Sequence, residues 1–227
     1  MEPRTARAQT APAIYAGVAV AAAIGFALVC AAVVMWGRTG PLPVDTAWAQ
    51  VMHAIRAPWL SVIALVCNVV GGVIVSGFVL PIGGVMALLL LRRPMAAVFV
   101  AAASAATAVI VQLCKVVVAR PRPEVIEVHT NFASFPSGHS ATAAALVITL
   151  ALVLGTWRWI NWAGPLYVLV MMASRNYLGA HWLSDTVAGA LLGVAATLGV
   201  WLLFRRALRT EAERAGLVGS SIESSRV

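Results

Sequence analysis

Long apolar runs constrain the fold of this chain more than any other feature of its sequence. Between residues 11 and 204, stretches of about 20 apolar residues follow one another, the length that a helix needs to cross roughly 30 Å of hydrocarbon. Hydrophobic residues make up 61% of the chain and charged residues only 11%, which lies outside the range of soluble globular domains. We therefore expect an all-α, polytopic bundle in a membrane.

The apolar runs predict six transmembrane helices, which cover residues 11–36, 61–91, 94–114, 137–156, 160–174 and 185–204. Residues 41–60 place apolar side chains at helical spacing, with Asp45, Gln50, His53 and Arg56 elsewhere on the wheel, as in an amphipathic interfacial helix. Glycine pairs and a proline interrupt the second span, which predicts one tilted or kinked helix. Domain boundaries follow: a tail over 1–10, a membrane domain over 11–204 and a polar tail over 205–227.

The distribution of charge predicts the topology. The net charge of +8 comes almost entirely from arginine, because Lys115 is the only lysine. With six spans, one side collects Arg4, Arg7, Arg92, Arg93, Arg158, Arg205, Arg206 and Arg209. The positive-inside rule makes that side cytoplasmic, with both termini inside. The Ala-, Val- and Arg-rich composition favours a bacterial plasma membrane, and nothing indicates nucleic-acid binding.

Three polar segments then emerge together on the outer side: residues 115–123, 136–139 and 174–185. Lys115, Arg122 and Arg175 supply three cations and many N–H donors, which suit a phosphate group. Gly138 allows close backbone approach, Ser137 offers a hydroxyl, and a helix start presents free N–H groups to an anion. These segments predict a phosphate-binding site at the membrane surface.

The two histidines of these segments have different neighbours. His181 precedes Asp185 by four residues, so in a helical turn the carboxylate accepts one ring N–H and leaves the other nitrogen nucleophilic. His139 lacks such a partner and is suited to protonate a leaving alkoxide. The hypothesis is attack of His181 on phosphorus, a phosphohistidine intermediate, and then attack by water with His139 as the base.

These blocks resemble the pattern of the type 2 phosphatidic acid phosphatase (PAP2) family, also called lipid phosphate phosphatases. The pattern K-x6-RP is matched by Lys115 and Arg122-Pro123, PSGH by residues 136–139, and SR-x5-H-x3-D by Ser174, Arg175, His181 and Asp185. The resemblance implies a metal-independent, cofactor-free hydrolase that acts on lipid phosphates at the outer leaflet. It also implies His181 as nucleophile assisted by Asp185, His139 as acid, and phosphate binding by Lys115, Arg122, Ser137, Gly138 and Arg175.

Each residue alone has an ordinary explanation, such as an arginine that snorkels to headgroups, a helix cap or a surface ion pair. Their coincidence on one face favours catalysis. Arg120 lies outside the pattern, where contact with a headgroup and simple loop solvation are equally expected, and Asn68 is expected to bond between helices.

Several choices of substrate and chemistry stay open. The outer face has too few carboxylates for a two-metal centre. Candidate substrates are polyprenyl pyrophosphate or phosphate, phosphatidic acid and phosphatidylglycerophosphate. A lipid phosphotransferase that uses the same histidine and a non-catalytic lipid-phosphate binder or transporter are the alternatives.

Overall fold

The computed structural model describes residues 4–36, 41–130, 133–154 and 160–215, and these residues form helices and no strand. The elements in chain order are α1 (Arg4–Trp36), α2 (Pro43–Ala54), α3 (Pro58–Val70), the π-helix η1 (Val73–Val79), α4 (Leu80–Leu90), α5 (Pro94–Val118), α6 (Gly138–Leu154), α7 (Ile160–Tyr177) and α8 (Leu183–Arg214). The prediction of an all-α fold is confirmed.

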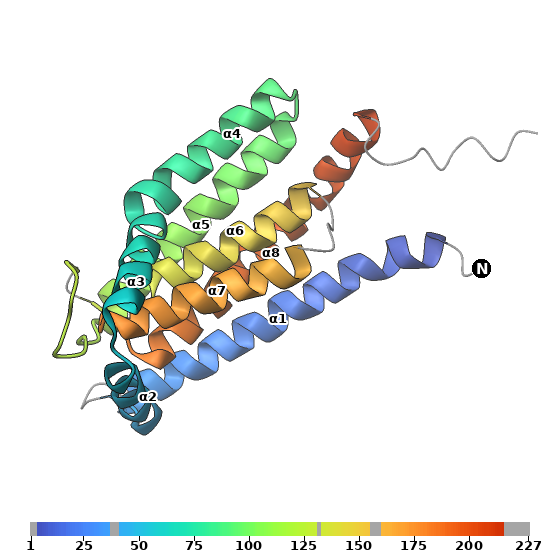
Figure 1. Ribbon diagram of the computed structural model, residues 1–227. Helices are drawn as coiled ribbons and strands as arrows, with labels where there is room; N and C mark the ends of the chain where they lie inside the picture. Colours follow the sequence, from blue (N-terminus) through green and yellow to red (C-terminus); the bar gives the residue numbers. More distant parts are fainter. Residues whose placement is uncertain (1–3, 37–40, 131–132, 155–159, 216–227) are drawn as a thin grey trace, which may run out of the picture.

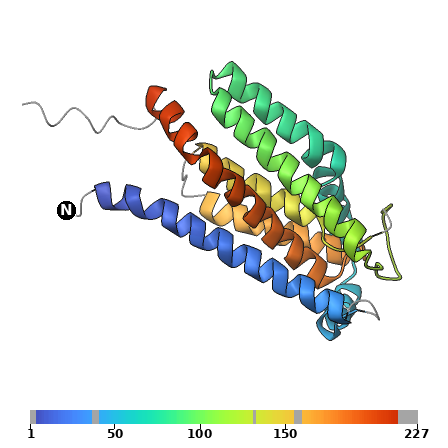
Figure 2. The same ribbon diagram turned by 180° about the vertical axis from the view of Figure 1, so that it is seen from behind.

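The long helices run side by side, with α8 packed against α1, α5 and α6 (Figure 1). One end of the bundle gathers α2, the start of α3, the segment after α5 and the turn between α7 and α8. The start of α1, the α4–α5 turn and the last turns of α8 lie at the opposite end, which the reverse view in Figure 2 shows equally well. The polar segments identified in the sequence therefore meet at one end.

Four stretches of the described chain are long and apolar enough to cross a membrane: Ala13–Trp36, Pro58–Leu90, Pro94–Val118 and Leu183–Arg214. The apolar helix Gly138–Leu154 is shorter. The six-span count and the interfacial position of α2 stay predictions, and Arg158 lies outside the described residues. The predicted kink of the second span is confirmed, because α3, η1 and α4 follow one another with a break at Gly71-Gly72.

Small residues allow α6 and α8 to approach closely. A side-chain carbon at Gly189 would overlap the carbonyl oxygen of Ser137, and one at Gly193 would overlap that of Ala141. Close backbone approach at small residues is a common way to pack helices in membranes, where burial of apolar surface gives little drive for association. This contact fixes the start of α6 against the start of α8.

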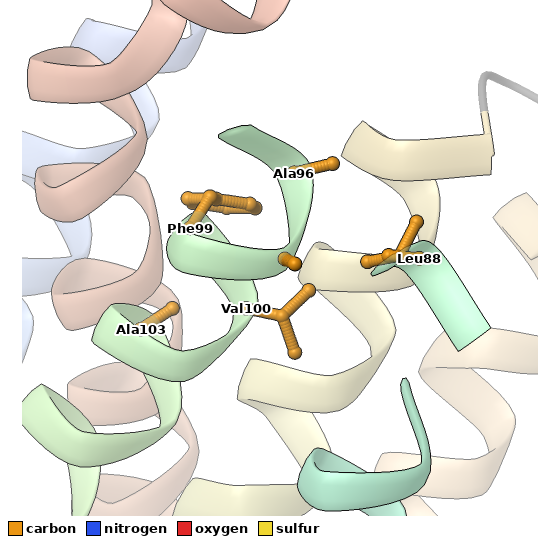
Figure 3. Close-up of a cluster of buried hydrophobic side chains, with 6 residues drawn as sticks. Leu88, Ala96, Phe99, Val100 and Ala103 are labelled. Carbon is orange, nitrogen blue, oxygen red and sulfur yellow. The ribbon is translucent and has the colours of Figure 1, made fainter. Parts of the chain in front are cut away.

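A second contact holds the opposite end together. Leu88, Ala96, Phe99, Val100 and Ala103 form a buried apolar cluster (Figure 3), against which Phe204 packs from α8. Helix α8 continues ten residues beyond Phe204, where the sequence pattern placed its end, and ends at Arg214. The physical reason is a cap, because the Glu211 carboxylate accepts the free N–H groups of Met95 (2.6 Å) and Ala96 (3.1 Å) at the start of α5.

A buried ion network joins the elements at the polar end. Asp45 of α2, expected on the polar face, is only 1% exposed, and Arg120, expected at a headgroup or in solvent, is 2% exposed. The Arg120 guanidinium bonds to Asp45 Oδ2 (2.6 Å) and to Asp185 Oδ1 (2.5 Å). Asp45 also accepts the backbone N–H and the hydroxyl of Ser184, each at 2.8 Å. Both sequence expectations were wrong because these partners are distant in the chain.

This network predicts a large effect of one substitution on stability. We expect Arg120→Met to lower the free energy of unfolding by about 3–5 kcal/mol, since it leaves two buried carboxylates without their cation. The measurement is reversible unfolding by titration with SDS in mixed micelles.

The matched control is Arg56→Met, which breaks an ion pair with Glu127 (2.8 Å) whose side chains are 27% and 31% exposed. Such a pair contributes below about 1 kcal/mol. Equal losses for the two variants would contradict a dominant role for the buried network.

Candidate active site

A cavity of about 1040 Å³ lies at the polar end, between α3, η1, α4, α5 and α6. Most of the side chains that the sequence singled out line it: Lys115, Arg122, Gly138, His139, Arg175 and His181. Asp185 lies behind His181, and Ser137 does not line the cavity. Residues from separate parts of the chain thus share one space.

The cations of this cavity bond to neutral oxygen atoms. Lys115, in the last turn of α5, donates to the Ala133 carbonyl (2.7 Å), and Arg122 donates to the same oxygen (2.8 Å) and to the Ala180 carbonyl. Arg175, 2% exposed near the end of α7, donates to Asn68 Oδ1 (2.6 Å). Neutral partners leave the charges of Lys115 and Arg175 uncompensated by these bonds, which favours an anion in the cavity. Burial lowers the pKa of Arg122.

His181 lies in the turn between α7 and α8 and is 5% exposed. Its Nε2 is 3.4 Å from the Arg122 guanidinium, which has only N–H groups to offer, so this nitrogen carries the lone pair. Nδ1 then carries the hydrogen and faces Asp185 Oδ2 at 3.7 Å, beyond normal hydrogen-bond length. Burial lowers the pKa of His181 to about 4, with Asp185 acting in the opposite direction. The ring is neutral and nucleophilic at Nε2.

Asp185 is held on both of its oxygens. Oδ1 accepts from Arg120, and Oδ2 accepts the Trp182 backbone N–H (2.9 Å). His181 precedes the first residue of α8, so the two side chains do not share the helical face that their spacing would give. The carboxylate acts instead as a cap at the start of α8 and faces the imidazole from there.

His139 is in the first turn of α6, and its Nε2 is 3.2 Å from the backbone carbonyl of Asn68. Asn68 therefore touches two predicted site residues, since its side chain accepts from Arg175. The sequence predicts Asn68 as a donor of a hydrogen bond between helices; the bond does join α3 to α7, but Asn68 Oδ1 accepts it from Arg175, and the place of Asn68 at the site was missed. The sequence feature that could have indicated this place is the polar amide side chain of Asn68, which lies three residues before a Gly-Gly pair in an otherwise apolar span.

Ser137 does not occupy the place expected of a phosphate ligand. Its backbone N–H donates to the Asp185 carbonyl (2.9 Å), its hydroxyl accepts from Ser140 Oγ (3.1 Å), and it is fully buried. The close approach of α6 and α8 explains this, because it turns Ser137 toward α8. Gly138 does line the cavity, as expected.

Within the described ranges, no three His, Cys, Asp or Glu side chains come together so that they could hold a metal ion. The described groups at the polar part of the cavity are a neutral imidazole, a second imidazole and several cations.

Known proteins resemble this chain in sequence. Over 60 residues the chain is 40% identical to an undecaprenyl-diphosphatase of Sulfolobus acidocaldarius, covering 26% of this chain and 28% of that protein. Over 78 residues it is 35% identical to a lipid A 1-phosphatase of Rhizobium johnstonii, covering 34% and 31%. The chain thus spans less than a third of the length of either relative.

Two solved structures have the same fold. A transmembrane PAP2 type phosphatidylglycerolphosphate phosphatase from Bacillus subtilis superposes with a TM-score of 0.69 at 22% identity, covering 83% of this chain and 96% of that one. LpxE from Aquifex aeolicus superposes with a TM-score of 0.61 at 23% identity, covering 70% and 95%. The model of the PAP2 superfamily matches residues 95–209, which is half of the chain and includes every motif described above. The chain belongs to the PAP2 superfamily.

Proposed function

We propose that this protein is an integral membrane phosphatase that hydrolyses a phosphomonoester or pyrophosphate of a lipid without a metal ion. The observation that carries the proposal is the two-part lining of one cavity. Lys115, Arg122 and Arg175 line its polar part, and Val73, Phe78, Ile82, Val85 and Met86 line its apolar part. A charged headgroup with an attached hydrocarbon tail matches this combination.

The proposed reaction begins with a bond between His181 Nε2 and phosphorus. The bond from phosphorus to the lipid oxygen breaks, and His139 protonates that oxygen. Water then attacks the phosphohistidine, His139 takes a proton from the water, and inorganic phosphate leaves. The cations stabilise the charge on the equatorial oxygens of both transition states, which is where most of the rate enhancement in phosphoryl transfer arises.

Asp185 supports this reaction from outside the cavity. Its carboxylate faces Nδ1 of His181 and stabilises the positive charge that the ring acquires when Nε2 bonds to phosphorus. Because Arg120 and the Trp182 N–H hold both oxygens, the carboxylate is fixed in position before the reaction. Lys115, Arg122, Gly138 and Arg175 bind the phosphate in this proposal, and Ser137 holds Gly138 in place through its bonds to α8.

The relatives favour a lipid substrate. The curated relatives are named for undecaprenyl diphosphate and lipid A, and one structural neighbour for phosphatidylglycerolphosphate. Each of these molecules is a lipid that carries a phosphate group in its polar part, which agrees with an apolar extension of the cavity. Polyprenyl pyrophosphate or phosphate, phosphatidic acid and phosphatidylglycerophosphate are the candidates for this chain.

The proposed location is the plasma membrane, with six spans, both termini in the cytoplasm and the site facing outward. The end opposite the site carries Arg92, Arg93, Arg205, Arg206 and Arg209, which the positive-inside rule assigns to the cytoplasm. The cavity then opens at the level of the outer headgroups, where a lipid phosphate is found.

One prediction of this proposal concerns the nucleophile. Purified wild type in detergent with EDTA is expected to release phosphate from at least one candidate lipid, and His181→Ala is expected to lose more than about 10³-fold in kcat, since no other group forms the covalent bond. Phosphate release is measured across the panel of candidate lipids.

His53→Ala is the matched control, because His53 is an exposed histidine of α2 that does not line the cavity. Activity that EDTA abolishes and Mg²⁺ restores would disprove metal independence. Full activity of His181→Ala would disprove the phosphohistidine mechanism, and release only after addition of an acceptor alcohol would indicate a phosphotransferase.

Another prediction of this proposal concerns the dependence of kcat/KM on pH. A lowered pKa keeps His181 neutral, and hence nucleophilic, as the pH falls past the ordinary histidine value of about 6.5. We expect kcat/KM, corrected for the ionisation of the substrate phosphate, to hold through that value and to decline only toward about pH 4. A pH profile of kcat/KM checks this, and an acid limb centred near 6.5 would contradict it.

A further inference from the structure

The break in the second membrane span lies directly against the active site. Helix α3 ends at Val70, and the π-helix η1 begins at Val73, so Gly71 and Gly72 separate two helical segments inside an apolar stretch. Ser76 bridges the break, because its hydroxyl is 2.7 Å from the Gly71 carbonyl and 3.0 Å from the Gly72 carbonyl. Breaks of this kind in membrane helices are tolerated where the backbone lines a cavity.

The break changes the partner of one backbone carbonyl. In a continuous helix the N–H of Gly72 would bond to the Asn68 carbonyl, but here it bonds to the Val69 carbonyl (3.2 Å). The Asn68 oxygen faces His139 Nε2 instead, at 3.2 Å. A carbonyl accepts and never donates, so Nε2 of His139 carries a hydrogen in this contact.

This contact determines which nitrogen of His139 exchanges protons. Nε2 keeps its hydrogen on the Asn68 carbonyl throughout the reaction. In the proposed mechanism His139 enters the reaction as the imidazolium, and Nδ1 is then the nitrogen that gives its proton to the lipid oxygen as the bond of that oxygen to phosphorus breaks, which leaves His139 neutral. Nδ1 also takes a proton from water as the oxygen of that water bonds to phosphorus and the bond to His181 breaks.

The same residue positions a phosphate ligand. Asn68 Oδ1 accepts from Arg175 at 2.6 Å, a short bond to a charged donor that is itself buried. Asn68 thus contacts the proposed acid through its backbone and a proposed phosphate-binding cation through its side chain. The geometry of both groups depends on where α3 ends.

The two glycines supply the space for this arrangement. A side-chain carbon at Gly71 would lie 2.7 Å from Cδ2 of His139 and 2.7 Å from Sδ of Met171, and one at Gly72 would lie 2.9 Å from the Asn68 carbonyl oxygen. Real side chains do not approach this closely, so Gly71→Ala displaces the imidazole together with the Met171 side chain, and Gly72→Ala displaces the Asn68 carbonyl. Gly83, in the same span, has no atom within 4 Å of such a position.

We propose that the broken second span is part of the catalytic apparatus, in which Asn68 is a positioning residue that orients His139 through its carbonyl and Arg175 through its amide. The proposal rests on the proposed phosphatase function. It extends that function by assigning Nδ1 of His139 to proton transfer and by explaining the Gly71-Gly72 pair.

The experiment compares two substrates that differ in their need for an acid. A lipid phosphate has an alkoxide leaving group that must be protonated, whereas p-nitrophenyl phosphate releases a phenolate that leaves without a proton. We expect Gly71→Ala to lower kcat for the lipid phosphate by about 10²–10³-fold and for p-nitrophenyl phosphate by less than about threefold, with KM for both nearly unchanged. Gly72→Ala is expected to give the same pattern, and Gly83→Ala to leave both activities unchanged.

The outcomes separate the possibilities. Equal losses of Gly71→Ala on both substrates indicate a merely structural role and overturn the inference, as does full activity on the lipid phosphate. Failure of the wild type to hydrolyse either substrate overturns the proposed function and this inference with it. If the wild type is active but neither glycine variant loses more activity on the lipid phosphate than on p-nitrophenyl phosphate, the inference alone is overturned.

Asn68→Leu tests the side-chain contact separately, since it keeps the backbone carbonyl. We expect the inhibition constant of inorganic phosphate to rise by about tenfold, because Arg175 loses a charge-assisted bond. The ratio of lipid phosphate to p-nitrophenyl phosphate activity is expected to stay at the wild-type value. An unchanged inhibition constant would overturn the assignment of Asn68 to Arg175.

Discussion

Arg120 between two buried carboxylates is the interaction on which the polar end of the bundle depends. Its guanidinium joins Asp45 of α2 to Asp185 of α8, and the segment that carries it follows α5, so one side chain ties three elements together. Removing these charges from water costs several kcal/mol per ion, and hydrogen bonds to the charged groups offset that cost. The further donors are the Leu42 N–H and both donors of Ser184 to Asp45, and the Trp182 N–H to Asp185. The position of Asp185, and with it that of His181, follows from this network.

The two histidines illustrate how one fold gives the same side chain two different environments. His181 faces a guanidinium at Nε2 and a carboxylate at Nδ1, so its hydrogen lies on the side away from the cavity cations. His139 faces a carbonyl at Nε2, so that nitrogen carries a hydrogen. Nδ1 is therefore the His139 nitrogen that we propose exchanges protons. The difference arises from backbone positions, namely the turn before α8 and the end of α3. Both rings contact protein groups before any substrate binds, and the proposed phosphoryl transfer would depend on preorganisation of this kind.

The spacing of apolar runs and of three short motifs was sufficient to predict the all-α fold, the kinked second span and most of the charged and histidine side chains that line the polar part of the cavity. These predictions rest on local patterns, namely the types of neighbouring residues and the number of residues between them. Asp45 and Ser184 are 139 residues apart, and Asn68 and Arg175 are 107 residues apart, so no local pattern indicates that they touch. The burial of Ser137 was not indicated for a related reason, because the contact of its N–H with the Asp185 carbonyl depends on the distance between α6 and α8.

The polar end also shows why a site of this kind forms at the edge of the hydrocarbon. Buried cations, a buried ion network and an interrupted helix all need partners that an apolar interior lacks. Here the carbonyls of Ala133 and Asn68 supply those partners, because one lies in an irregular segment and the other at a helix end. The same irregular backbone that satisfies Lys115 and His139 opens the cavity beside them. Breaks in helical structure therefore supply hydrogen-bond partners and line the cavity at once, and the end of α3 does so next to two of the motifs.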